Sequence, residues 1–151
     1  MAAIRVEKTI PAPIEAVFDV ISDHAGYSRF PGIQSSELAR EGEAEPNGLG
    51  ALRRIRSRPL RFEEEITRFE RPTRMDYLIV DVNAPIRHHG GSMVLSEEGS
   101  GTRVVWTSTT CKDGGDRVEV RDVIMVLAER PNVTILTEDC FRPVSPRARF
   151  R

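Results

Sequence analysis

Hydrophobic residues alternate with polar ones at the start of the chain and then adopt a helical period. Alternation over residues 4–10 predicts a first β-strand. Pro11 ends it, and Pro13 followed by Glu15 favours the start of a helix. The apolar positions of this helix are Ile14, Val17, Phe18 and Ile21. A short second helical turn runs to Pro31-Gly32, so two helices are predicted after the first strand.

Beyond residue 32, strand patterns follow one another with only turn residues between them. The predicted strands cover residues 33–40, 49–57, 60–69, 75–82, 88–97 and 102–110. Glycine, proline, asparagine and serine mark the breaks between them. Strands this close together, without intervening helices, pair antiparallel. With the first strand they predict a curved seven-stranded sheet, and the chain length suits a single α+β domain over residues 1–151.

The pattern becomes ambiguous near the C-terminus. Residues 116–129 fit both a helix and a strand, and we interpret them as a helix that Pro131 should end. Residues 132–141 give no clear assignment, and residues 142–151 resemble a loose tail. Few apolar residues are available there to offset the entropy lost on ordering. We therefore expect residues 131–151 to be the least ordered part of the domain.

Composition and charge argue against a nucleic-acid-binding, membrane-spanning or secreted protein. The formal net charge is −1, whereas binding to nucleic acid or to an anionic membrane rewards a clear positive excess. No apolar run approaches the ~20 residues of a membrane span, and residues 1–8 lack the apolar block of a signal peptide. Cys111 and Cys140 have no metal-ligand spacing and suggest reduced thiols. We expect a soluble, cytoplasmic protein without membrane insertion, and the arginine excess over lysine suggests a GC-rich bacterial source.

The order of the predicted elements resembles the helix-grip fold of the START-like (SRPBCC) superfamily, and especially its bacterial polyketide cyclase/dehydrase-type members. The residues that carry the resemblance are 9–18, Asp23, Tyr27, 30–32, 48–53, Glu64, Ile66 and 101–107. It covers roughly residues 4–110. The resemblance implies a C-terminal helix over the concave face of the sheet and a cavity between them. After Cys111 the chain departs from the usual long, Leu/Ala-rich closing helix.

Two predicted hairpins place charged residues on an otherwise apolar face. If Arg58-Pro59 is a two-residue turn, Arg53 faces Glu64 and their neighbours on that face are apolar. A loop over residues 98–101 fixes the register of the last hairpin in the same way. The inward row predicted from these registers is Arg53, Glu64, Tyr77, Met93 and Trp106, with His89 and Thr110 toward one end.

An isolated buried charge costs several kcal/mol, so Arg53 and Glu64 should pair, with Tyr77 placed to donate to Glu64. One interpretation is a satisfied polar network that fixes the register of the sheet. The other is a polar anchor in an apolar pocket, the usual composition of a small-molecule site. The candidate ligand-binding residues are Phe30, Arg53, Phe62, Glu64, Tyr77, His89, Met93, Trp106 and Thr110. If the site is catalytic, Arg53 could stabilise an enolate while Glu64 or Tyr77 moves the proton.

Other polar patterns are more simply structural. The arginines between residues 53 and 61 could form a phosphate site, but the even-numbered ones suggest a solvated sheet face. His88 and His89 are adjacent on one strand, so only one of them can face inward, and we expect no metal or cofactor. Gly90-Gly91 predicts a bulge or bend in a curved sheet.

Three functions remain open from the sequence. The leading hypothesis is the binding of a small hydrophobic or aromatic metabolite by a monomer or homodimer. The second is a polyketide cyclase or dehydratase that uses Arg53, Glu64 and Tyr77. The third is a protein-interaction module, as in chaperone-activator relatives of this fold, in which an outer surface matters and no ligand is needed.

Overall fold

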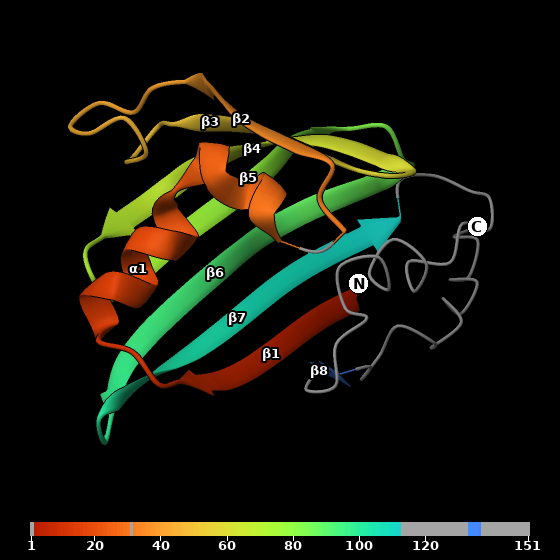
Figure 1. The fold of residues 1–151 in the computed structure, drawn as a ribbon. Helices are drawn as coiled ribbons and strands as arrows, with labels where there is room; N and C mark the ends of the chain where they lie inside the picture. Colours follow the sequence, from red (N-terminus) through yellow and green to blue (C-terminus); the bar gives the residue numbers. More distant parts are fainter. Residues whose placement is uncertain (1, 31, 113–132, 137–151) are drawn as a thin grey trace, which may run out of the picture.

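A strongly curved antiparallel sheet partly surrounds two short helices (Figure 1). The computed structural model describes residues 2–30, 32–112 and 133–136. Its elements are β1 (Ala2–Ile10), α1 (Ile14–Ser22), the 3-10 helix η1 (His24–Arg29), β2 (Ser35–Arg40), β3 (Leu52–Ser57), β4 (Leu60–Glu70), β5 (Arg74–Val82), β6 (Ile86–Glu98), β7 (Gly101–Lys112) and β8 (Val133–Leu136). The strand order is β2-β3-β4-β5-β6-β7-β1-β8. The predicted seven antiparallel strands and two helices are confirmed.

The eighth strand is an addition that the sequence did not predict. β8 pairs antiparallel with β1, from Val6 opposite Val133 to Ala3 opposite Leu136. The expected helix over residues 116–129 and the expected tail over residues 142–151 lie outside the described residues. No helix within the described ranges is long and apolar enough to cross a membrane.

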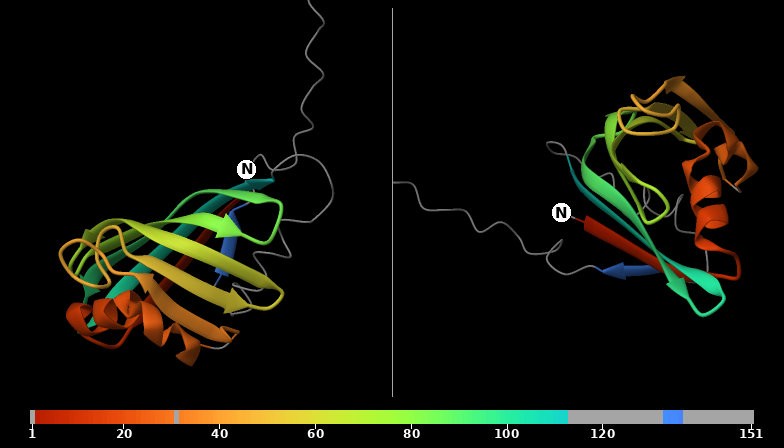
Figure 2. Two further views of the ribbon diagram at one scale, coloured as in Figure 1. Left: turned by 90° about the horizontal axis from the view of Figure 1, so that it is seen from above. Right: turned by 90° about the vertical axis from the view of Figure 1, so that its left-hand side faces the viewer.

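Helix α1 covers part of the concave face, as two further views show (Figure 2). Its first residue follows Pro13, whose fixed backbone suits a helix start. Ile14, Val17 and Phe18 are buried, whereas Glu15 lies on the exposed side. They form one apolar cluster with sheet residues that include Ile66, Met75 and Leu95. The predicted inward face of this helix is therefore confirmed.

Both hairpin registers predicted from the sequence are confirmed. Arg53 lies opposite Glu64 in the β3–β4 hairpin. Met93 lies opposite Trp106 in the β6–β7 hairpin. The straight row predicted across the sheet is wrong at Tyr77, because bulges shift the β4–β5 register on both sides. Tyr77 consequently faces Ile66 across the ladder, and the residue opposite Glu64 is Ile79.

A bulge in β6 reverses the expected orientation of the two adjacent histidines. The register shifts between His88 and Gly90, and Gly90 has a φ of 132°, which favours glycine. The predicted bulge is thus confirmed. Because the extra residue inverts the alternation, His88 faces inward with 6% of its surface exposed, while His89 lies on the outside. The placement of His89 on the inner face was wrong.

Candidate functional site

A buried ion pair joins β3 to β4 beneath the helices. The Nε of Arg53 donates to Oε2 of Glu64, and the two residues are only 2% and 5% exposed. The guanidinium carbon of Arg53 lies 4.7 Å from the ring centroid of Tyr27 and 5.2 Å from that of Tyr77. Contacts of a desolvated guanidinium with aromatic faces are favourable. The predicted pairing of Arg53 with Glu64 is therefore confirmed, with two tyrosine rings as additional partners.

His24 completes the surroundings of this pair and was missed as a site residue. Its Nδ1 lies 3.3 Å from Nη1 of Arg53, and its Nε2 lies 2.9 Å from the carbonyl oxygen of Asn47. Because a carbonyl only accepts, Nε2 carries the proton and Nδ1 accepts from Arg53. Burial, reinforced by the charge of Arg53, lowers the pKa of His24 to about 3. The imidazole is consequently neutral near pH 7.

Burial and mutual attraction together set the pKa values of Arg53 and Glu64. Burial raises the pKa of Glu64 above its ordinary value, although the charge of Arg53 and its hydrogen bond act in the opposite direction. Burial alone would lower the pKa of Arg53, but Glu64 and the two tyrosines outweigh this effect and raise it. Arg53 therefore stays charged. A guanidinium with a carboxylate, an imidazole and two rings around it is well satisfied, which fits a structural anchor.

A second polar chain crosses the inner face from β5 to β7. Ile79 donates its backbone N–H to Nδ1 of His88 at 2.9 Å, so the proton of the neutral imidazole must lie on Nε2. That Nε2 lies 3.0 Å from Oγ of Ser108 and donates to it. Burial, then the charge of His89, lowers the pKa of His88 to about 4, which keeps this tautomer neutral.

Tyr77 stands at the end of this chain. The indole Nε1 of Trp106 donates to its hydroxyl oxygen at 2.8 Å, and Ser108 also bonds to it. The ring stacks on His88 with centroids 5.4 Å apart. Burial, followed by the charge of Glu64, raises the pKa of Tyr77, so the hydroxyl stays protonated. The predicted hydrogen bond from Tyr77 to Glu64 is wrong, because the register shift directs the hydroxyl to Trp106 instead.

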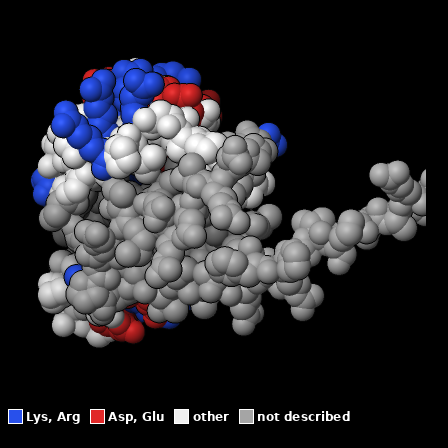
Figure 3. Space-filling model, turned by 90° about the vertical axis from the view of Figure 1, so that its right-hand side faces the viewer, with Lys and Arg blue, Asp and Glu red and all other residues white. Residues whose placement is uncertain are grey.

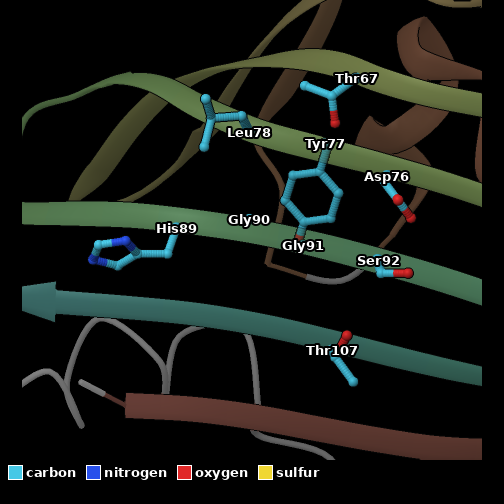
Figure 4. A pocket seen from close by; sticks show the side chains of 9 residues that line it. All are labelled: Thr67, Asp76, Tyr77, Leu78, His89, Gly90, Gly91, Ser92 and Thr107. Carbon is cyan, nitrogen blue, oxygen red and sulfur yellow. The ribbon is translucent and has the colours of Figure 1, made fainter.

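Gly91 makes the position of Tyr77 possible. A Cβ added at Gly91 would lie 2.1 Å from Cζ of the Tyr77 ring, so only glycine allows this close approach. Figure 4 shows the ring extending from β5 across to the backbone of β6 at this glycine. The glycine therefore determines which way the tyrosine lies on the inner face.

Thr110 is a buried polar residue of the inner face to which the described residues offer no hydrogen bond. It is 6% exposed and lies opposite His88 in the β6–β7 ladder. Its hydroxyl oxygen is buried, with no hydrogen-bond partner within the described part of the structure. An unsatisfied buried hydroxyl costs about 1–3 kcal/mol. Such a group is evidence for a missing hydrogen-bonding partner at this position.

The predicted ligand-binding residues fall into separate groups. Arg53, Glu64, Tyr77 and Trp106 are brought together through the contacts above. Phe62 belongs to a second apolar cluster with Tyr27, Ile55 and Leu60, against which Phe30 packs. Met93 and Trp106 pack against the first cluster instead. The additional inner-face residues that sequence reasoning missed are His24, Tyr27, His88 and Ser108.

Two cavities lie along the line where β5 and β6 separate. These strands pair only between residues 74–77 and 91–94. The larger cavity, of about 420 Å³, is lined on the outer side of the sheet by residues such as Asp76, His89 and Ser92 (Figure 4). The second, of about 290 Å³, lies between residues 79–84 and 86–88. The cavity expected between the sheet and a C-terminal helix involves residues outside the described ranges.

No metal centre is found within the described residues, where no three His, Cys, Asp or Glu side chains are grouped to hold an ion. His24 and His88 each bond to separate partners. His89 lies 2.9 Å from Sγ of Cys111 on the outer side, away from both inner networks. On the inner face, the described side chains interact through hydrogen bonds, aromatic contacts and one buried ion pair.

Comparison with solved structures shows the same fold in several proteins. A START superfamily protein from Mycobacterium smegmatis has a TM-score of 0.67 and 11% identity, covering 85% of this chain and 92% of that one. The protein XoxI from Bacillus cereus has a TM-score of 0.64 and 19% identity, covering 82% and 85%. The Aha1 dimer from Colwellia psychrerythraea has a TM-score of 0.59 and 13% identity, covering 82% and 85%.

The sequence itself identifies the family. No curated protein matches the chain. However, a family model described as polyketide cyclase / dehydrase and lipid transport matches residues 1–128, which includes every strand from β1 to β7 and both helices. The solved structures above share the fold of this chain. The chain therefore belongs to the polyketide cyclase / dehydrase and lipid transport family.

Proposed function

We propose that the protein binds a small hydrophobic or aromatic molecule against the concave face of the sheet, over β5, β6 and β7. The observation that carries the proposal is the buried Thr110 hydroxyl that lacks a partner within the described residues. A hydrogen-bonding group of a ligand would satisfy it. Family membership supports the same conclusion, because the family description includes lipid transport.

The surroundings of Thr110 match the usual make-up of a small-molecule site. Trp106 and Met93 are only partly buried and contribute apolar surface on the same face of the sheet. Ser108 and Tyr77 supply hydroxyl groups on the same face. Ligand pockets are mostly apolar, with a few polar groups that fix the orientation of the ligand. The Arg53–Glu64 pair lies on β3 and β4 instead, and we assign it the role of holding these strands and η1 around the site.

Thr110→Val provides the direct test, since valine keeps the shape of threonine and removes the hydroxyl. Purified protein would be incubated with a lipophilic cell extract, washed and analysed by native mass spectrometry. We expect the wild-type protein to retain a molecule in a one-to-one complex and the variant to retain much less. Thr107→Val, on the outer side of β7, serves as the matched control. Equal retention by all three proteins would refute the assignment of Thr110, and no retention by any would refute ligand binding.

A cyclase or dehydratase activity is a second candidate, favoured by the hydrogen bonds around Tyr77. Its hydroxyl oxygen accepts from Trp106, a bond that leaves its own proton available to a bound molecule. A protonated phenol of this kind can act as a general acid. Tyr77→Phe should then abolish turnover of a polyketide-type substrate while binding is retained. If Tyr77→Phe reduces turnover only as far as it reduces binding, Tyr77 has no separate catalytic role and only the carrier role remains.

A further inference from the structure

In the part of the chain that the structure describes, three arginines at one hairpin have no ion pair, whereas most of the others do. Among the described residues, carboxylate partners are present for Arg5, Arg29, Arg40, Arg53, Arg54, Arg68, Arg71, Arg74 and Arg103. Arg87 also interacts with other groups. Within this part of the chain, the guanidinium groups without an ion pair are those of Arg56, Arg58 and Arg61. All three are exposed and belong to the β3–β4 hairpin. We refer to them as the arginine tip.

The arrangement of the arginine tip does not favour stability. Arg56 lies directly opposite Arg61 in the β3–β4 ladder. Like charges directly opposite each other on adjacent strands are destabilising. The position next to Arg56 on β2 is Ser35, so this row contributes no acid on that side. A surface that keeps uncompensated charge at such close range is better explained by an anionic partner than by folding.

The neighbouring row of the sheet carries more acidic than basic side chains. There Arg54 bonds to Glu37 at 2.5 Å and to Glu63 at 2.7 Å, and Asp81 lies opposite Glu63. This row therefore carries three acids to one arginine, whereas the arginine tip carries three arginines and no acid. Basic side chains, with some acidic ones among them, gather at the upper end of the molecule in Figure 3, the end at which β2, β3 and β4 lie in Figure 1.

Side-chain hydrogen bonds hold the backbone of the tip from both sides. The backbone N–H of Arg58 donates to Oε1 of Gln34 at 2.7 Å. The backbone N–H of Arg61 donates to Oδ1 of Asn83 at 2.6 Å, and the Asn83 amide donates to the carbonyl of Pro59 at 3.1 Å. The three guanidinium groups therefore start from a fixed backbone, which reduces the entropy lost when they bind.

We propose that the arginine tip docks the protein on an anionic phospholipid surface, from which the ligand of the proposed function would be taken or to which it would be delivered. The proposal thus rests on the proposed function. Guanidinium groups recognise phosphate oxygens through paired hydrogen bonds. A protein partner would require an apolar interface core. The large exposed apolar residues in the described ranges are Val20, Leu49, Val80 and Val94, and none belongs to the hairpin.

The test is sedimentation with lipid vesicles. The protein would be mixed with vesicles of phosphatidylglycerol and phosphatidylcholine or of phosphatidylcholine alone. Replacing Arg56, Arg58 and Arg61 together by glutamine should weaken binding to the anionic vesicles by about 100-fold, and high salt should have a similar effect. The control replaces Arg5, Arg68 and Arg103 by glutamine, which removes the same charge elsewhere. Its binding should change by only a few-fold.

Further measurements distinguish a failure of the membrane-docking proposal from a failure of the proposed ligand binding. Equal binding to neutral vesicles, an equal loss in the control variant, or stronger binding to an acidic peptide such as polyglutamate would overturn the proposal. The fluorescence of Trp106 measures binding of a hydrophobic probe to the triple variant and so shows whether its concave face is intact. A wild-type protein that binds the probe but no vesicles would refute membrane docking alone. A wild-type protein that binds vesicles but no probe would refute the proposed function.

Discussion

Removing one member of the Arg53–Glu64 pair should destabilise the protein more than removing both. Both residues are almost completely buried, so a single substitution leaves the other group without its main partner. Breaking a buried pair in this way typically costs about 3–5 kcal/mol, whereas replacing both by apolar residues is often nearly neutral. A protein of this size has a total stability of roughly 5–15 kcal/mol, so these effects are large.

The two single substitutions should differ. Arg53→Met leaves Glu64, which can take up a proton because burial already raises its pKa. Glu64→Leu leaves a guanidinium that cannot lose its proton. The remaining contacts of Arg53 with His24 and two tyrosine rings compensate only part of that loss. We therefore expect Glu64→Leu to be the more destabilising change, and the double variant to recover at least about 2 kcal/mol relative to the sum.

Urea denaturation of the four proteins measures this coupling energy directly. The half-exposed pair Arg54–Glu63 provides a matched control on the same two strands, with an expected coupling below about 1 kcal/mol. If a single variant is too unstable to measure, Glu64→Gln keeps the shape of the side chain and supplies a milder member of the cycle. Additivity within about 0.5 kcal/mol would show that the buried pair does not interact, and the argument for a structural anchor would be lost.

Three further predictions concern other parts of the domain. Thr110→Val should raise the free energy of unfolding of the ligand-free protein by about 1 kcal/mol, because it removes an unsatisfied hydroxyl, and a decrease in urea denaturation would show that the hydroxyl has a partner. Because folding lowers the pKa of His24 to about 3 and of His88 to about 4, the unfolded chain binds more protons below pH 6.5. Stability should therefore fall as pH decreases from about 6.5 toward 4, by up to about 1.4 kcal/mol per pH unit for each histidine, and asparagine variants should flatten this dependence. An identical dependence in the variants would exclude the histidines as its cause. Val17→Asp should abolish cooperative thermal unfolding, whereas Glu15→Lys should change stability by less than about 0.5 kcal/mol; similar melting temperatures would contradict the orientation of α1.

Local patterns were sufficient to predict the parts of the fold that depend on short-range geometry. The two-residue turn at residues 58–59 determines the β3–β4 register, because opposite positions follow from the turn by counting. The helix over residues 14–22 follows from its period and its proline start. The pairing of Arg53 with Glu64 then follows from the cost of leaving either charge alone in the interior.

Bulges explain most of what the sequence did not predict. An extra residue in a strand inverts every following side chain, and alternation alone does not show where the inversion occurs. The glycines at residues 90–91 indicated a bulge but not which histidine it would turn inward. The register shifts between β4 and β5 have no such marker in the sequence, so the hydroxyl of Tyr77 was assigned to the wrong partner.

Residues distant in sequence account for the rest of the site. His24 and Tyr27 belong to the 3-10 helix η1, and their contacts with Arg53 depend on how that helix packs on the sheet. Neither hydrophobic period nor spacing contains this information. The short strand β8 depends in the same way on long-range pairing with β1.

The claim that the concave face binds a hydrophobic molecule can be measured through the single tryptophan of the chain. Trp106 lies on that face and donates to Tyr77, so its fluorescence reports on ligands bound there. Titration with N-phenyl-1-naphthylamine, a neutral aromatic probe, should give saturable one-to-one energy transfer from Trp106. Met93→Lys, on the same face, should abolish it, whereas His89→Ala, on the outer side, should not. Absence of saturable transfer, or equal transfer in Met93→Lys, would contradict the account.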